Sequence, residues 1–322
     1  MGKSNEALPL RYFSNVNARE VDWLWYPYIP FGKITLIQGD PGDGKTMLAL
    51  NIAALLSNGS PMPDSDRKID CTRIIYQSAE DGAEDTIKPR LVSAGADCSR
   101  IAFIDESVQN LTLNDARFES AIKETEARLI VIDPLQAYLG ENSEMSRADG
   151  IRPMMKQLAA VAERSGSAII IIGHMNKASG TKGIYRSLGS IDITASARSV
   201  LLVGRIKSNS SIRVMAQLKN SLAEEGKPIA FEINENSKVR WIGEYDITAD
   251  ELLSGDESQS EGTRLTEAVD SLKSILIDKK APCVHIYTTL QELGISKRSV
   301  DRAKKILGIK STKHTDGWYW SL

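Results

Sequence analysis

The chain has 322 residues, a formal net charge of −2, and 42% hydrophobic and 25% charged residues. This composition is that of an ordinary globular protein, long enough for one large domain and a small one, and the overall charge gives no argument for nucleic acid. No apolar run reaches the roughly 18 residues that a membrane helix needs, and Met1–Arg11 lacks the apolar core of a signal peptide. The three scattered cysteines, Cys71, Cys98 and Cys283, favour reduced thiols. We therefore expect a cytoplasmic protein with no membrane partner.

Short apolar runs alternate with helical patterns over most of the chain. After an aromatic lead-in at 12–31, the strand candidates are Ile34–Gln38, Arg73–Gln77, Ile101–Ile104, Leu129–Asp133, Ala168–Ile172 and Val200–Val203. The helix candidates between them are Lys45–Ser57, Asp115–Ala127 and Arg147–Ser165. Runs such as LIVID and AIIII are typical of parallel strands buried on both faces, so we predict an α/β fold with a mostly parallel central sheet. Three strands without helices between them predict antiparallel additions at the sheet edge: Ile212–Leu218, Ile229–Ile233 and Lys238–Ile242.

The segment GDPGDGKT fits the phosphate-binding pattern G-x-x-x-x-G-K-[ST] and lies between a strand candidate and a helix candidate, as that loop requires. Glycines let backbone N–H groups approach a phosphate, and the helix that follows points its positive end at the same place. Lys45 can reach the β and γ phosphates, and the Thr46 hydroxyl can bind Mg²⁺. A coincidental Gly/Asp turn is the alternative. The predicted ligands are ATP and Mg²⁺, and the predicted nucleotide-binding residues are Gly39, Asp40, Pro41, Gly42, Asp43, Gly44, Lys45, Thr46 and Met47.

Acidic residues follow two of the apolar strands. Asp133 ends the run LIVIDP, at the edge where ligands bind in such sheets, and is placed to support Mg²⁺; the alternative is a turn before Pro134. In QSAED, Glu80 could act as general base on the attacking water. Asp81 could do the same or cap a helix that begins near Ala83. We favour Glu80.

Another strand, in IIIIGHMNK, ends at His174, which could sense the γ phosphate or have a structural role. The following loop, Gly180–Gly183 with Lys177 and Lys182, could contact DNA or be a solvated turn.

The composition changes after residue 245. Asp246–Gly262 is acidic and rich in Ser and Gly, which is typical of an exposed linker. The remainder has its own apolar pattern and more Lys and Arg than Asp and Glu. We predict a nucleotide-binding domain at 1–245, a flexible linker at 246–263 and a small DNA-binding domain at 264–322.

This last segment has the pattern of a winged helix-turn-helix. Helices are expected at Leu265–Ile277, His285–Leu293 and Lys297–Leu307, the third after a Gly294–Ser296 turn, and the tail predicts a hairpin wing with Trp318 and Trp320 in packing roles. Arg298 and Arg302 lie one turn apart and could enter the major groove, while lysines could hold phosphates. The alternative is a winged helix that contacts only protein. The predicted DNA-binding residues are Lys297, Arg298, Arg302 and Lys305.

Taken together, these motifs resemble those of the RecA-like P-loop ATPases, in particular the AAA_25 family, which includes the RepA-like plasmid replicative helicases. The features that carry the resemblance are WLWYPYIPFGKITLIQGDPGDGKT, SAED, LIVIDPL, IIGHMNK, GSIDITASARSVLLV and QLKNSLAEEG, over roughly 14–243. The resemblance implies a RecA-like core in which Glu80 activates water and His174 couples the nucleotide state to DNA. The tail, through GISKRSVDRAKKILGIK and GWYW, resembles the winged-helix modules appended to such proteins in mobile elements.

In this family a basic residue of a neighbouring subunit lies against the γ phosphate. Arg198, in ASARSV, matches that position best, and Lys219, in QLKN, matches a second basic position. The alternatives are an Arg on a solvated helix face and a Lys at a strand end. A cation supplied in trans implies a ring or filament, and the resemblance favours a homohexamer with single-stranded DNA through the ring and double-stranded DNA on the winged helix.

The leading hypothesis is an oligomeric, DNA-associated ATPase, a helicase-like replication protein of a plasmid, phage or mobile element. The plasmid helicase is essentially the ATPase core alone, so the added C-terminal domain suggests recruitment to a particular DNA site. One alternative is a site-specific DNA-binding regulator that ATP switches with little turnover. Another is a recombination or repair filament ATPase.

Overall fold

The computed structural model describes residues 10–65, 67, 69–140, 148–175, 191–207, 209–234, 237–254, 261–277, 280–293, 295, 297–314 and 317–322. For residues 148, 149, 191, 192, 261–266 and 298 it describes the backbone alone. Within these ranges, no helix combines the length and the apolar character needed to cross a bilayer. The loop Gly180–Gly183, the residues Gly294 and Ser296, and residues 255–260 of the expected linker lie outside the described residues.

A nine-stranded sheet forms the centre of the molecule, in the order β11-β10-β9-β8-β3-β7-β6-β4-β5. Six neighbouring strands run parallel: β3 (Ile34–Gly39), β4 (Ile74–Ser78), β5 (Ile101–Ala102), β6 (Leu129–Asp133), β7 (Ala168–His174) and β8 (Ser199–Arg205). Three antiparallel strands extend it: β9 (Ile212–Asn220), β10 (Ile229–Ile233) and β11 (Val239–Glu244). The predicted α/β fold with a mostly parallel sheet is therefore confirmed.

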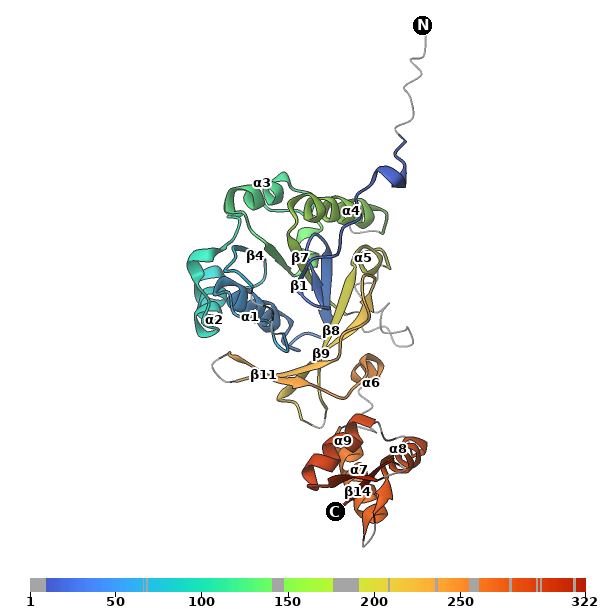
Figure 1. The fold of residues 1–322 in the computed structure, drawn as a ribbon. Helices are drawn as coiled ribbons and strands as arrows, with labels where there is room; N and C mark the ends of the chain where they lie inside the picture. The colour runs from blue at the N-terminus through green and yellow to red at the C-terminus, as the bar shows by residue number, and fades with distance from the viewer. Residues whose placement is uncertain are drawn as a thin grey trace.

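Helices cover both faces of the sheet (Figure 1). One face packs against α1 (Lys45–Ser57) and α2 (Lys88–Ser93), and the other against α3 (Ala116–Thr125), α4 (Ala148–Ser165) and α5 (Ile191–Ser196). Since both faces are covered, strands such as β6 are buried at every position, and this explains why their sequences are apolar throughout. Shorter helical turns are η1 (Phe13–Asn15), η2 (Ala83–Ile87, π-helical), η3 (Cys98–Arg100) and η4 (Leu135–Tyr138).

The aromatic lead-in forms a small hairpin of β1 (Trp23–Trp25) and β2 (Ile29–Pro30). The Trp25 ring is buried and meets the Trp241 ring of β11 edge to face, with 5.7 Å between their centroids. Trp241 in turn donates from Nε1 to Asn51 Oδ1 of α1, at 2.9 Å. The hairpin, the antiparallel extension and the helix after the phosphate loop thus share one apolar cluster on this face of the sheet.

The acidic segment predicted as a linker is partly folded. Residues Ala249–Ser254 form α6, and Leu252 of this helix is buried against Gly204 of β8, where a Cβ would lie 2.9 Å from the leucine Cγ. Helix α7 also begins inside the predicted linker, at Glu261. The expectation of an exposed, flexible segment over all of 246–263 was therefore wrong for these residues, because burial of one leucine fixes a helix in otherwise polar sequence.

The C-terminal residues form a separate apolar cluster, drawn from residues 268–320 alone. Its elements are α7 (Glu261–Leu276), β12 (Ala281–Pro282), α8 (Cys283–Glu292), α9 (Lys297–Ile306), β13 (Lys310–His314) and β14 (Gly317–Ser321). The three expected helices and the hairpin are present, and β12 adds a third, unpredicted strand beside β14. Trp320 is buried in this cluster, whereas Trp318 is half exposed. We call residues 261–322 the C-terminal module.

Candidate nucleotide-binding site

The segment GDPGDGKT connects β3 to α1 at the carboxyl edge of the parallel strands. Gly42 and Gly44 have φ values of +82° and +95°, which favour glycine strongly. A Cβ on Gly44 would also lie 2.7 Å from Ile233 Cδ1 and 2.9 Å from Arg213 Cδ, so the antiparallel extension packs directly against the loop. Because Gly44 is the N-cap of α1 and no side chain caps it, the first N–H groups of the helix remain available to a phosphate.

Lys45 lies inside this loop and is almost fully buried. Its Nζ donates to the carbonyl oxygens of Gly39 at 2.9 Å and Asp40 at 2.8 Å. Burial lowers the pKa of this amine, while the neighbouring carboxylates Asp43 and Asp133 oppose that shift. An ammonium has three donors, and these two bonds leave one for a phosphate oxygen.

Thr46 and Asp133 are brought together as the sequence predicts. Thr46 Oγ1 donates to Asp133 Oδ2 at 2.7 Å, and the hydroxyl of buried Tyr76 donates to the same oxygen at 3.1 Å. Burial raises the pKa of Asp133, and the hydrogen bonds from Thr46 and Tyr76 oppose that shift. Tyr76 was missed by the sequence reasoning, although a hydroxyl in the otherwise apolar run RIIY, two residues before a strand end, is a signal that could have found it.

The donors at this place fit Mg²⁺. A threonine hydroxyl and one carboxylate are hard oxygen ligands, and Mg²⁺ in nucleotide sites takes its other ligands from phosphates and water. The described part of the chain holds no cluster of three or more His, Cys, Asp or Glu side chains suited to a metal ion. A site of this kind requires the nucleotide to complete it.

The two carboxylates of QSAED differ in their surroundings. Asp81 Oδ2 accepts from Arg90 Nη1 at 2.7 Å, and it does not cap η2, whose N-cap is Gly82. Glu80 is exposed and forms no hydrogen bond or ion pair with another described residue. Its charge acts on both Lys45 and Asp133, which places it beside the phosphate loop. Glu80 is thus the carboxylate of this pair that is available to a water molecule, and its role as base stays a prediction.

His174 ends β7 directly beside Gly39, its register partner on β3. Its Nδ1 is buried without a hydrogen-bond partner among the described residues. The fold therefore places His174 at the edge of the phosphate loop, as expected, and its role in coupling the nucleotide state to DNA stays a prediction.

Arg198 and Lys219 lie at the opposite edge of the sheet. The backbone N–H of Arg198 donates to Ile34 O, at the start of β3, and Lys219 pairs with Val200 at the start of β8. The length of β3 from Ile34 to Gly39 is about 17 Å at about 3.3 Å per residue. Arg198, level with Ile34, is therefore too far away to act on the phosphate loop of its own chain, and the Lys219 ammonium is held at the same edge by the carbonyl oxygen of Ala197.

These two basic residues also differ from each other. Lys219 Nζ donates to the carbonyl oxygens of Thr194 at 2.9 Å and Ala197 at 2.8 Å, at the C-terminal end of α5. Arg198 is exposed, and its side chain forms no hydrogen bond or ion pair within the described ranges. Burial and the charge of Arg198 lower the pKa of Lys219. Of the two cations, Arg198 is the one presented to solvent.

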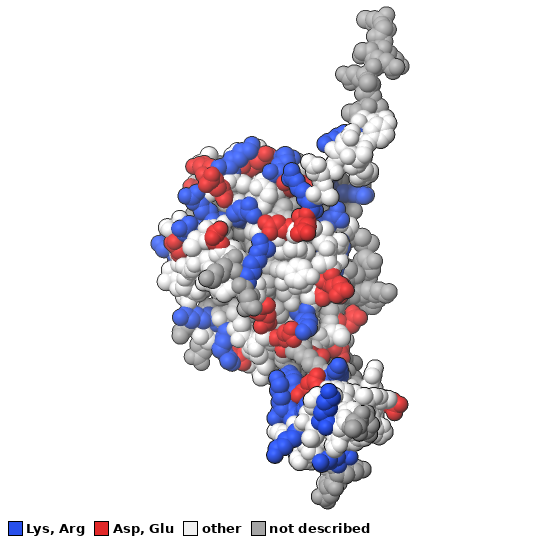
Figure 2. Space-filling view, in the orientation of Figure 1, with Lys and Arg blue, Asp and Glu red and all other residues white. Residues whose placement is uncertain are grey.

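Figure 2 shows Lys and Arg side chains at several places on the visible face of the C-terminal module. Lys297, Arg302 and Lys305 of α9 are exposed, as predicted, and the side chain of Arg298 lies outside the described residues. Strand β13 adds Lys310 and Lys313, both exposed, which the sequence reasoning left out. Their place on a strand next to α9 could have been inferred from the predicted hairpin.

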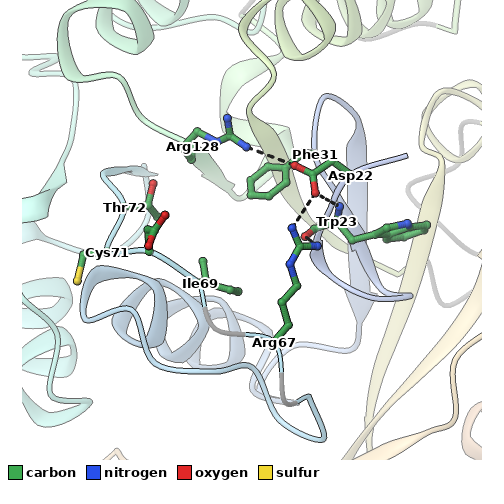
Figure 3. Close-up of a pocket in the computed structure, with 9 residues that line it drawn as sticks. Asp22, Trp23, Phe31, Arg67, Ile69, Cys71, Thr72 and Arg128 are labelled. Carbon is green, nitrogen blue, oxygen red and sulfur yellow. Dashed lines mark hydrogen bonds and ion pairs between the residues drawn. The ribbon is translucent and has the colours of Figure 1, made fainter. Parts of the chain in front are cut away.

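A cavity of about 410 Å³ lies elsewhere, at the amino edge of the parallel strands. Figure 3 shows Asp22 held between two arginines, at 2.9 Å from Arg67 Nη2 and 3.7 Å from Arg128 Nη2. The Arg128 guanidinium also stacks on the Phe31 ring, 4.2 Å from its centroid. None of the residues that line this cavity belongs to the phosphate loop, so it is distinct from the nucleotide site.

Comparison with known proteins identifies the family of the chain. Residues 8–180, more than half of the chain, match the AAA_25 family model, described as an AAA domain. The chain is 24% identical over 255 residues to the DNA repair protein RadA of Bacillus subtilis, which covers 78% of this chain and 49% of the relative. The RadA of Streptococcus pneumoniae is 24% identical over 255 residues (78% and 53%), and that of Mycobacterium tuberculosis H37Rv is 22% identical over 264 residues (78% and 48%). The chain thus spans about half the length of these relatives. With its phosphate loop, its parallel sheet and this match, the chain belongs to the AAA_25 family of RecA-like P-loop ATPases.

Proposed function

We propose that the chain hydrolyses ATP with Mg²⁺ at the carboxyl edge of its sheet. The observation that carries this proposal is the convergence of Lys45, Thr46 and Asp133 around the phosphate loop, with Glu80 unpaired beside them. The loop N–H groups and Lys45 bind the phosphates and stabilise the charge that develops on them. Bound Mg²⁺ neutralises phosphate charge, and Thr46 and Asp133 would hold it. Glu80 takes the proton of the water that attacks the γ phosphorus, and His174 is placed to respond to its release.

We infer in addition that a second copy of the chain completes the site. Arg198 lies about 17 Å from the phosphate loop of its own chain by strand length, and the Lys219 ammonium is held at the same edge by the carbonyl oxygen of Ala197. Arg198 is exposed at that edge, whereas Lys219 is held by carbonyl oxygens of α5. Arg198 therefore acts in trans, and Lys219 positions the segment next to it. Head-to-tail contacts of this kind form a ring, for which a hexamer is proposed, or a filament.

The polymer on which the ATPase acts is proposed to be DNA. The matched relatives are named DNA repair proteins, and the C-terminal module exposes lysines and an arginine on α9 and β13. Exposed cations can supply the phosphate contacts that dominate affinity for DNA. We propose that the module is a winged helix that binds double-stranded DNA through Lys297, Arg298, Arg302 and Lys305, while the ATPase core acts on single-stranded DNA.

Two versions of this function remain in competition. The sequence motifs favour a helicase-like replication protein. The names of the matched relatives favour a recombination or repair ATPase. Steady-state ATP hydrolysis should be measured with and without single-stranded DNA for the parent and for Lys45→Ala. Turnover that rises with DNA and is absent in the variant supports the proposal, and strand-separation and strand-pairing assays then decide between the two versions. A parent that binds ATP and DNA but turns over negligibly contradicts it and favours a nucleotide-switched DNA-binding regulator.

A further inference from the structure

The phosphate loop of this chain is acidic. GDPGDGKT carries Asp40 and Asp43 against one cation, Lys45. A nucleoside triphosphate is itself a polyanion, and two carboxylates on the loop that receives it oppose binding by like-charge repulsion. The loop therefore requires additional positive charge from outside the motif.

Arg205, the last residue of β8, supplies such a charge. Its Nη2 donates to the carbonyl oxygen of Gly42, and its Nε lies 3.5 Å from Asp43 Oδ1. The other carboxylate oxygen of Asp43 accepts the backbone N–H of Asp40 at 3.0 Å. One guanidinium thus contacts the outer side of the loop at two neighbouring residues, and through Asp43 it supports a third.

Arg213 of β9 lies directly opposite Arg205 in the sheet register. Its side chain packs against Gly44, and its Nε is buried without a hydrogen-bond partner in the described part of the chain. Burial, together with the charge of Arg205, lowers the pKa of Arg213, whereas Asp43 opposes the shift. Two cations, Arg205 of β8 and Arg213 of β9, therefore lie against the loop, and the charge of Asp43 acts on both.

We propose that Arg205, supported by Arg213, is a positioning residue that neutralises Asp43 and so enables the acidic loop to bind a nucleoside triphosphate. This inference rests on the proposed nucleotide site and adds a role for Arg205 and Arg213, on the paired strands β8 and β9. The side chain holds the loop from its outer face and does not touch the reacting atoms. Its effect is on affinity for the nucleotide and on the salt dependence of that affinity.

The test is a double-mutant cycle on the full chain, with a fluorescent ATP analogue and Mg²⁺ as the probe. Arg205→Gln should weaken binding about tenfold, the size expected when a charge-assisted contact is lost. Asp43→Asn should bind at least as tightly as the parent, since its side-chain oxygen still accepts the Asp40 N–H. The double variant should return to within about threefold of the parent, because the charge that required Arg205 is gone. The loss in Arg205→Gln should be larger at low ionic strength than at high ionic strength.

Arg240→Gln is the matched control. Arg240 lies on β11 of the antiparallel extension, and its guanidinium pairs with Glu232 of β10 at 2.5 Å and not with a residue of the loop. Equal affinities of Arg205→Gln and Arg240→Gln overturn the inference, and so does a double variant as weak as Arg205→Gln alone. A parent that fails to bind, or a Lys45→Ala variant that binds as the parent does, overturns the proposed nucleotide site itself. Without ligand, the Tm of the Arg205 and Asp43 variants should match that of Arg240→Gln. An equal Tm shows that weaker binding comes from the lost positive charge and not from unfolding.

Discussion

The hydroxyl of Tyr76 offers a direct test of how the Mg²⁺ site is held. Tyr76→Phe removes one of the two hydrogen bonds to Asp133 Oδ2 and no packing volume, since the ring stays in its buried place on β4. A buried hydrogen bond to a charged group contributes about 1.5–3 kcal/mol. Because Thr46 still donates to Asp133, we expect a loss near the lower end, about 2 kcal/mol in the free energy of unfolding, or roughly 5 °C in Tm.

Tyr138→Phe serves as the control for this change. Tyr138 is also buried, but its hydroxyl lies 3.4 Å from Glu106 Oε1, which accepts from Gln77 Nε2 as well. Its loss should cost less than about 1 kcal/mol, because a bond of that length is weak and Glu106 keeps another donor.

The assay is equilibrium unfolding in urea for both variants, followed by the Mg²⁺ concentration needed for half-maximal nucleotide binding. Groups that orient a metal-supporting side chain typically change metal affinity by about tenfold or more, so Tyr76→Phe should require more Mg²⁺. Equal destabilisation by the two variants, with an unchanged Mg²⁺ requirement, would refute the assigned role of Tyr76.

Three further changes test other parts of the molecule. Gly44→Ala should abolish nucleotide binding in a titration, because its Cβ would lie 2.7 Å from Ile233 Cδ1 in a backbone conformation with φ of +95°; parental affinity would show that the loop is not held as described. Asp115 caps α3 through the N–H of Arg117, whose side chain also holds the pKa of Asp115 below its usual value, so Asp115→Ala should cost about 1 kcal/mol at neutral pH. Because the folded-state pKa of Asp115 is depressed, that stability is present above the unfolded pKa of about 3.9 and is lost as the pH falls through the folded value. Urea unfolding should therefore show a difference in stability between the variant and the parent that is smaller at acidic pH than at neutral pH. A difference that persists in acid would contradict the contribution of the Asp115 charge. Lys305→Gln should weaken binding to double-stranded DNA for all sequences alike and lower the salt slope by about one, as measured by a titration over ionic strength, whereas an unchanged slope would remove this residue from the interface.

The sequence predicted those parts of the molecule that local pattern controls. The bounds of α1, Lys45–Ser57, are those expected, and the motif residues Thr46 and Asp133 meet through one hydrogen bond. Buried parallel strands require continuous apolar runs, and phosphate loops require glycines at fixed spacing. Both features can therefore be predicted from a single sequence.

What sequence reasoning missed depends on pairing between distant segments. Arg205 and Arg213 face the loop only because β8 and β9 pair in one register, which no local pattern specifies. Likewise, the burial of Leu252 against Gly204 makes a helix of a stretch whose composition is typical of a linker. The separation of Arg198 from the phosphate loop became visible once the strand directions were known.

The measurement that tests the central claim most directly is ATP hydrolysis with single-stranded DNA by mixed variants. Lys45→Ala lacks the phosphate-loop cation, and Arg198→Ala lacks the proposed trans cation, so each alone should be inactive while the parent is active. In an equal mixture, about a quarter of the contacts between copies should join an intact loop to an intact Arg198, and activity should return to about that fraction. A mixture that stays inactive, although the two variants assemble together and bind DNA, would contradict a site shared between two copies, and activity in Lys45→Ala alone would contradict the site itself.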